Sequence, residues 1–237
     1  MIWCLAKWQL DTSEANEKIY LVDISAGQID YIQAILTHLR GINVSRTYCS
    51  SCHYPEKTCI CKWVKPIEPP IEIIILQHGS EASHAKNTVK LLELGLNRIT
   101  TLCGEEADNF QEIASECALS PEKYAVCFPS EQSTPIEESV LQWERGNASQ
   151  TFEHVIFIDA SWRKALKMWH LNPWLHQLKT WHFSEPPENR YRIRKTSKEN
   201  SLSTLESVAY VLSLGWKVDC SNLLTLLNAR QQYFPNR

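Results

Sequence analysis

The sequence predicts an α/β domain built on a mainly parallel sheet. Short apolar runs alternate along the chain with segments whose apolar residues have helical spacing. The run from Ile71 to Leu76 is nearly all isoleucine and leucine, which is typical of a strand buried on both faces. Strands that alternate with helices imply a parallel sheet. With 237 residues and 43% hydrophobic content, the chain can bury a sizeable core.

Three segments follow one another along the chain. Residues 1–45 alternate apolar and polar side chains and then show helical spacing, so we predict a strand-and-helix extension. Residues 46–65 hold a cluster of cysteines. The proline-rich stretch that begins at Pro66 can continue neither a helix nor a central strand, and it leads into the α/β domain at 66–237.

Within the α/β domain, the pattern assigns strands and helices in turn. We expect strands at 71–76, 124–128, 154–158 and 179–183. We expect helices at 84–94, 136–143, 161–169, 202–214 and 220–232. Ligands of such sheets gather beyond the carboxyl ends of the strands, so the residues that follow each strand are the first candidates for a site.

Composition limits which cellular compartments and which binding partners we expect. No apolar run reaches the ~20 residues that a membrane span needs, and the amino-terminal residues do not read as a secretory signal. We therefore expect a cytoplasmic protein without membrane contact, and nothing in the sequence implies an obligate protein partner. The formal net charge of -3 argues against indiscriminate coating of nucleic acid, so RNA contacts would need local clusters of Lys and Arg.

Four cysteines lie close together in the sequence, at Cys49, Cys52, Cys59 and Cys61. This spacing can surround one tetrahedral zinc ion with thiolates. A closed four-thiolate site has no open coordination position, so the Zn2+ would be structural. A redox dithiol pair and chance clustering are the alternatives, while the odd total of nine cysteines fits a disulfide framework poorly.

Polar residues follow the first predicted strand of the α/β domain. They are Gln77, His78, Glu81, Asn87 and Thr88. Their position at the carboxyl end of a buried strand makes them candidates for ligand recognition. The alternative is a plain helix start with Ser80 or Ser83 as N-cap and an Asn-Thr pair that is merely exposed, and the local sequence slightly favours it.

A carboxylate stands at the carboxyl end of the third predicted strand, at Asp159. In that position it could act as a general base or hold a cationic group of a ligand. Its alternative role is to cap the helix that follows, because Asp and Ser, here Ser161, are both preferred N-caps. The residues alone give the two roles about equal weight.

A basic stretch from Arg190 to Lys198 concentrates five cations in nine residues. Such a stretch can neutralise RNA phosphates, and Tyr191 could stack on a base, although a plain solvated surface is the alternative. Just after it, Ser203 and Glu206 match a capping box, so a helix begins there and offers N–H groups to a carboxylate or phosphate. No glycine-rich loop follows any strand, which argues against an ordinary Rossmann nucleotide site.

Several motifs, in this order, resemble the DTW-domain family of tRNA-uridine aminocarboxypropyltransferases of the bacterial type. They are CxxC-x6-CxC, LQHGSEA with NT, CFPSE, FIDASW with KAL, and YRIRK with LSTLE. The match runs from about residue 46 to residue 214. The four residues from Asp159 to Trp162 stand where the family has Asp-x-Thr-Trp, and Ser161 replaces the threonine.

This resemblance implies a SPOUT-like fold with a knotted cofactor site and S-adenosylmethionine as the group donor. Two further departures concern loop geometry: Gly79 stands where the family usually has proline, and Val89 where it has glycine. The resemblance also implies that backbone groups near Leu76 and Phe128 recognise adenine. Thr204 and the helix start beside it would bind the methionine carboxylate.

Site residues follow from the resemblance position by position. The cofactor-binding set is Leu76, Gln77, His78, Glu81, Asn87, Thr88, Phe128, Pro129, Ser130, Asp159, Trp162, Leu202, Thr204 and Glu206. The catalytic set is Asp159, Ser161 and Trp162. Clustered cations suggest a tRNA-binding set of Arg163, Lys164, Arg190, Arg192, Arg194 and Lys195.

The implied reaction is attack by N3 of a tRNA uridine, expected in the variable loop, on the carbon chain next to the sulfonium. Methylthioadenosine would leave, and Asp159 would assist loss of the N3 proton. Three alternatives remain at this point. They are a SPOUT-type RNA methyltransferase, an enzyme that places the same group on ribosomal RNA, and a non-catalytic zinc-containing RNA-binding module.

Overall fold

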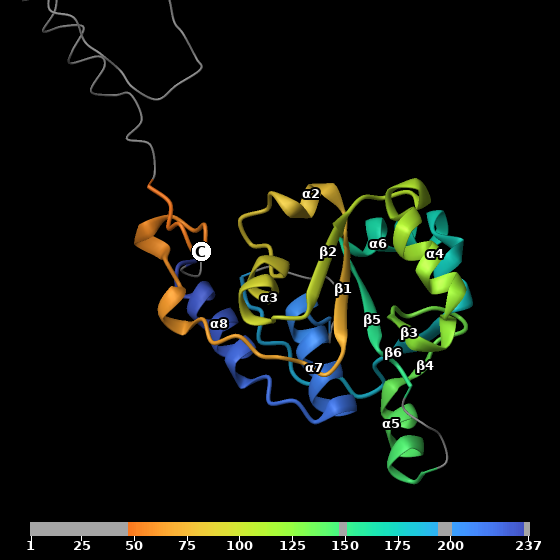
Figure 1. Ribbon diagram of the computed structural model, residues 1–237. Helices are drawn as coiled ribbons and strands as arrows, with labels where there is room; N and C mark the ends of the chain where they lie inside the picture. The colour runs from red at the N-terminus through yellow and green to blue at the C-terminus, as the bar shows by residue number, and fades with distance from the viewer. Residues whose placement is uncertain (1–46, 147–150, 194–200, 235–237) are drawn as a thin grey trace, which may run out of the picture. The chain divides into compact units, whose positions relative to one another are not determined.

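The computed structural model describes residues 47–146, 151–193 and 201–234 (Figure 1). The extension predicted at 1–45 lies outside these residues. Thr47–Arg237 forms one compact unit, which includes both the cysteine segment and the α/β fold. Among the described residues, none of the helices has the length and apolar character that a membrane crossing requires.

A six-stranded sheet in the order β2-β1-β5-β3-β6-β4 forms the centre, and every neighbouring pair is parallel. The strands are β1 (Glu72–Gln77), β2 (Ile99–Cys103), β3 (Tyr124–Cys127), β4 (Thr134–Pro135), β5 (His154–Asp159) and β6 (Lys179–His182). The predicted α/β fold with a mainly parallel sheet is therefore confirmed. Sequence reasoning missed β2, whose side chains are only partly buried, and β4, which has 2 residues.

Helices connect these strands. They are α2 (Gly79–Ala82), α3 (Val89–Gly95), α4 (Gln111–Leu119), α5 (Ile136–Glu144), α6 (Trp162–Leu171), α7 (Thr204–Trp216) and α8 (Ser221–Gln231). The helices predicted at 136–143, 161–169, 202–214 and 220–232 correspond to α5, α6, α7 and α8, with small differences at their ends.

Two helix predictions differ from the structure. The helix predicted at 84–94 begins only at Val89, because the Asn87 side-chain oxygen accepts the Val89 N–H at 2.8 Å and holds the chain in a turn there. Helix α4 was not predicted. It buries only Ile113 and Cys117, so its helical pattern is weak in the sequence.

Each face of the sheet has its own hydrophobic core. Ile73 and Ile75 of β1 belong to the cluster with α3, α5, α7 and α8, while Ile74 and Leu76 belong to the cluster with α4 and α6 (Figure 1). All four side chains are at most 3% exposed. This alternation confirms that β1 is buried on both faces.

The cysteine segment packs onto the α/β fold. It contains two short 3-10 turns, η1 (Glu56–Thr58) and η2 (Cys61–Trp63), and lies beside α8 (Figure 1). Cys52 and Ile60 are fully buried and belong to the same hydrophobic cluster as residues of α3 and α8. The buried side chains of this segment therefore extend the core of the sheet.

Candidate functional site

The site is built where β1 and β5 end side by side. Gln77 and Asp159 are partners in the parallel register of these strands. The Gln77 amide donates to Asp159 Oδ2 at 2.9 Å and to Asn87 Oδ1 at 3.3 Å. Thr204 at the start of α7 donates its hydroxyl to Asp159 Oδ1 at 2.5 Å. The two carboxylate oxygens are thus held by donors from two different parts of the chain.

Asp159 does not cap the helix that follows it. Ser161 is the N-cap of α6, and no side chain makes a cap hydrogen bond there. Asp159 is 8% exposed and is one of the residues that line a cavity. The N-cap position of α6 therefore belongs to Ser161, and Asp159 is part of the cavity wall.

A cavity of about 630 Å³ opens at the carboxyl ends of the strands. This size lies within the ~300–1,000 Å³ typical of small-molecule sites. The predicted residues that line it are Glu81, Asn87, Thr88, Phe128, Pro129, Asp159, Ser161, Trp162, Leu202 and Thr204. These residues come from segments far apart in the sequence, which the parallel sheet brings to one edge.

Five residues of the predicted cofactor set do not line the cavity. They are Leu76, Gln77, His78, Ser130 and Glu206. Leu76 is fully buried in the core, and Gln77 acts on the site through Asp159. Ser130 forms a turn with Ser133, whose hydroxyl accepts the Ser130 N–H at 3.0 Å.

Glu206 closes the predicted capping box of α7. Its carboxylate accepts the Ser203 N–H at 2.9 Å, and the Ser203 hydroxyl accepts the Glu206 N–H at 3.3 Å. The other carboxylate oxygen accepts the Arg190 N–H at 2.5 Å. The capping prediction is confirmed, and Glu206 ties the basic stretch to the helix start.

The backbone N–H of Phe128, which was expected to help recognise adenine, already has an acceptor. The Phe128 N–H already donates to the Trp181 carbonyl at 2.9 Å, so only other atoms of this residue can contact an adenine. Its ring is buried and stacks on Trp169 at 4.9 Å.

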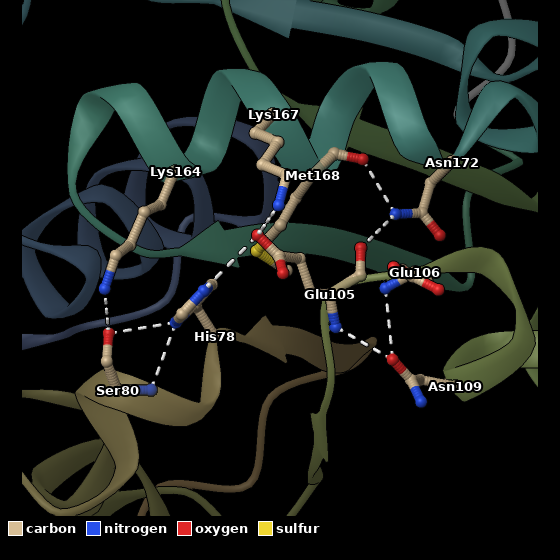
Figure 2. A network of polar contacts seen from close by, with 9 residues as sticks. All are labelled: His78, Ser80, Glu105, Glu106, Asn109, Lys164, Lys167, Met168 and Asn172. Carbon is tan, nitrogen blue, oxygen red and sulfur yellow. Dashed lines mark hydrogen bonds and ion pairs between the residues drawn. The ribbon is translucent and has the colours of Figure 1, made fainter.

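His78 belongs to a polar network at the end of β1 (Figure 2). The Ser80 N–H donates to His78 Nδ1 at 3.0 Å, so Nδ1 is an acceptor and Nε2 faces Glu105 at 3.5 Å. Lys167 lies 3.0 Å from Glu105, and this hydrogen bond is the main cause that lowers the pKa of the Glu105 carboxyl. Lys164 contacts the Ser80 hydroxyl. The network joins the end of β1, the loop after β2 and α6.

The slightly favoured interpretation of the first loop was wrong. His78, and neither Ser80 nor Ser83, is the N-cap of α2. Thr88 is 6% exposed, and Asn87 accepts a hydrogen bond from Gln77. The Asn-Thr pair is therefore part of the cavity wall and is not simply exposed.

Several cavity residues were not predicted. They include Lys86, Trp181, His182, Asn189 and Tyr191. The His182 ring lies 2.9 Å from the Ser133 hydroxyl. His182 is the last residue of β6, and a strand was predicted there, so its position at a strand end was a signal for a site residue. Tyr191 was predicted as a base-stacking residue of the basic stretch, but not as part of the cofactor cavity.

The predicted tRNA-binding residues lie in different settings. Arg163 is exposed on α6, whereas Lys164 is half-buried against Ser80. Arg190 and Arg192 are exposed, and the Gln231 side chain holds their backbone at 3.1 and 2.6 Å. Tyr191 is only 8% exposed and lines the cavity, so its predicted stacking on an RNA base stays a prediction. Arg194 and Lys195 lie outside the described residues.

The four cysteine sulfurs form one cluster, all within 4.8 Å of one another. Cys49 and Cys61 are 3.5 Å apart, and Cys52 and Cys59 are 3.7 Å apart. A tetrahedron with Zn–S bonds of ~2.3 Å has S–S edges of about 3.8 Å. The cluster therefore has the donor set and the spacing of a four-thiolate metal site.

The thiols influence one another strongly. Hydrogen bonds from the backbone of Cys52 and Ser51 lower the pKa of Cys49 to about 6. Hydrogen bonds with Cys49 and the other cluster thiols raise the pKa of Cys61 to about 12. A metal site requires all four thiols to be ionised. Because the other thiols raise the pKa of Cys61, a cation among the sulfurs is needed to stabilise that state.

Comparison with known proteins identifies the family. A family model described as the DTW domain matches residues 46–234, which is most of the chain. The chain belongs to the DTW domain family. The match includes the cysteine cluster, the strand ends and α7, so the DTW domain of this chain holds the whole candidate site.

Curated relatives of this DTW chain have a common name. It is 27% identical to tRNA-uridine aminocarboxypropyltransferase 2 of Mus musculus, over 74% of this chain and 58% of the relative. It is 28% identical to the Drosophila melanogaster protein of that name, over 71% and 66% respectively. The chain thus spans less than two thirds of these relatives. No solved structure matches it at a significant level.

Proposed function

We propose that this chain transfers the 3-amino-3-carboxypropyl group of S-adenosylmethionine to N3 of a uridine in tRNA. The observation that carries the proposal is the Asp159 carboxylate, held by Gln77 and Thr204 in the wall of a cavity of about 630 Å³. The names of the mouse and fly relatives supply the reaction class. The variable loop of tRNA is the proposed target region, and the cytoplasm the proposed compartment.

The cavity residues suit this donor chemically. S-adenosylmethionine supplies a sulfonium that activates the attached carbon chain towards a nucleophile. Asp159 places a negative charge where the cationic groups of the donor would lie. Phe128 and Trp181 give the cavity apolar wall that suits a nucleoside, and Thr204 begins a helix whose N-terminal turn favours a carboxylate. A SPOUT-like knot around this site is part of the proposal.

Asp159 is the proposed base for the N3 proton. Hydrogen bonds from Gln77 and Thr204 fix the orientation of the carboxylate, so it need not reorganise when the uridine enters the cavity. Trp162 is 42% exposed at the mouth, and its indole N–H donates to the Ser201 hydroxyl at 3.2 Å. Trp162 is the proposed aromatic contact for the donor and the uridine, and its exposure supports this role.

Zinc is the proposed metal of the cysteine cluster, in a structural role. The donor set is all sulfur and the sulfur spacing fits tetrahedral Zn2+. For tRNA, the proposed phosphate contacts are the exposed guanidinium groups of Arg163, Arg190 and Arg192, together with Arg194, Lys195 and Lys164.

The test is a transfer assay with two donor preparations. Purified protein is incubated with tRNA and S-adenosylmethionine labelled either in the methyl group or in the carboxypropyl chain. We expect only the chain label to enter tRNA, with methylthioadenosine as the second product. Methyl label in tRNA together with S-adenosylhomocysteine would identify a methyltransferase instead. An absence of donor binding would reduce the chain to an RNA-binding module.

A further inference from the structure

We infer that Arg230 is a positioning residue that couples the cysteine segment to the segment 84–88, of which Lys86, Asn87 and Thr88 line the cavity. The inference rests on the proposed function in naming S-adenosylmethionine as the molecule that fills the cavity and zinc as the metal of the cysteine cluster. Arg230 is on α8, far in sequence from both segments, and does not line the cavity. Its side chain nevertheless contacts residues of both.

The Arg230 guanidinium is buried and contacts two aromatic rings. It lies 4.0 Å from the ring centroid of Tyr54 and 4.7 Å from that of Phe234. Its Nη2 donates to the Ala85 carbonyl at 3.2 Å. The side chain is only 8% exposed, and this burial lowers the pKa of Arg230. A buried cation depends on such contacts, so the position of Arg230 follows the position of its partners.

Tyr54 is fixed by the cysteine turn. It stands 2 residues after Cys52, and its carbonyl accepts the Cys49 N–H at 2.8 Å. His53, between Cys52 and Tyr54, has a φ of 53°, and its carbonyl accepts a hydrogen bond from Lys90 at 2.9 Å. A metal that holds Cys49 and Cys52 in place therefore also holds the ring on which Arg230 rests.

Ala85 is continuous with the cavity wall. Lys86, Asn87 and Thr88 follow it directly, and all three line the cavity. Asn87 accepts the hydrogen bond from Gln77, and Gln77 also donates to Asp159. Contacts thus run without a gap from the metal ligands through Tyr54 and Arg230 to the carboxylate of the site.

This arrangement predicts a coupling between metal occupancy and donor affinity. When the cysteine turn loosens, Arg230 loses an aromatic face, and the Ala85 carbonyl loses the fixed position of its donor. The segment 84–88 then has to be ordered by the incoming ligand, which weakens binding. By thermodynamic reciprocity, the bound donor also favours retention of the metal.

The experiment measures S-adenosylmethionine affinity of the zinc-loaded full chain by calorimetry. For Arg230→Met we expect a dissociation constant about tenfold higher, and a smaller change for Arg230→Lys. Arg98→Met is the matched control, because Arg98 also donates to a carbonyl, that of Pro70 at 2.8 Å, but lies before β2 and away from the cavity. The S-adenosylmethionine affinity of Arg98→Met should stay at the wild-type value.

A second arm tests the coupling itself. Removal of zinc should weaken donor binding in the wild type and have much less effect in Arg230→Met. Zinc transfer to a colorimetric chelator should be faster in Arg230→Met than in the wild type or Arg98→Met. Where Arg230→Met does not fold, Tyr54→Leu replaces it, since it removes the same aromatic contact from the other side.

The outcomes separate this inference from the proposed function. A wild-type chain that does not bind S-adenosylmethionine overturns the proposed function, and the zinc-transfer rates then decide on Arg230 by themselves. Wild-type donor affinity in both Arg230→Met and Tyr54→Leu overturns the coupling, as does an equal effect of zinc removal in all variants.

Discussion

At the scale of single residues, the surroundings of Asp159 depend on residues far away in the sequence. It follows a buried strand, and this suggested either a helix cap or a ligand contact. The structure gives it two donors, Gln77 and Thr204, at 2.9 and 2.5 Å, and a place in the cavity wall. Both donors are side chains that sequence reasoning had assigned to direct contact with the cofactor.

Replacement of Asp159 by asparagine tests its proposed role as base. The amide keeps the shape of the carboxylate but cannot take a proton, so we expect turnover to fall by about 10²–10⁴-fold. The measurement is single-turnover transfer to tRNA at saturating donor. Asp108→Asn, at an exposed carboxylate outside the cavity, serves as the control. Wild-type turnover in Asp159→Asn, with donor binding intact, would remove the base assignment.

At the scale of elements, the first turn of α5 holds the chain that leaves β6. The Glu137 carboxylate accepts the N–H groups of Ser184 and Glu185 at 3.3 and 3.1 Å and the Tyr210 hydroxyl at 2.8 Å. Partial burial opposes ionisation, but hydrogen bonds from the backbone and from Tyr210 outweigh it and lower the pKa of Glu137. The ionised form therefore stabilises the cavity wall next to it.

Glu137→Gln should destabilise the fold in a pH-dependent way. Because the folded pKa is lower than the unfolded value of ~4.3, the stabilisation is full above that value and is lost as pH falls through the folded pKa. We expect a melting temperature about 2–4 °C below wild type at pH 7, and a smaller difference in acid. Thermal unfolding of Glu137→Gln and of Glu138→Gln, its exposed neighbour, would measure this. A difference that grows in acid would contradict the assignment.

The basic stretch before α7 exposes Arg190 and Arg192 among its described residues. Replacing Arg192, Arg194 and Lys195 by glutamine should weaken tRNA binding. It should also reduce the slope of log affinity against log salt by roughly 0.7–0.9 for each phosphate that the variant no longer neutralises. Donor affinity should not change. Lys123→Gln is a suitable control, because Glu153 pairs with Lys123 at 2.9 Å. An unchanged salt slope in the triple variant would return the stretch to plain surface.

At the scale of the whole molecule, the cysteine segment is part of the common core. Cys52 and Ile60 are fully buried in the cluster that also holds α3 and α8. Loss of the metal should therefore affect global unfolding and not only the local turn.

Cys52→Ser should lower both zinc content and stability. Zinc at about 1,000 times its dissociation constant would contribute about 4 kcal/mol to the free energy of unfolding, and most of this should be lost. Metal analysis and thermal unfolding give the readout. Cys103→Ser, at an exposed cysteine outside the cluster, should retain one zinc per chain and the wild-type melting temperature. Equal stability of the two variants would show that the cluster holds no structural metal.

Where a structural feature depended on neighbours in the sequence, it could be predicted. The apolar run of β1, the capping box at Ser203 and Glu206 and the cysteine spacing are all local patterns, and the structure contains each of them. Elements whose local patterns are weak were missed, because the prediction depended on those patterns. Helix α4 and strand β2 expose much of their surface, so their sequences lack strong periodicity.

The sequence by itself determined the fold class, most elements and the set of cysteines, because periodicity and spacing act over a few residues. Only the tertiary structure decided which side chains share the cavity. Gln77 and Asp159 are 82 positions apart and meet because β1 pairs with β5 in register. Packing also buried Tyr191 and placed Arg230 between Tyr54 and Ala85. Such contacts depend on strand order and helix packing, for which no local pattern carries the information.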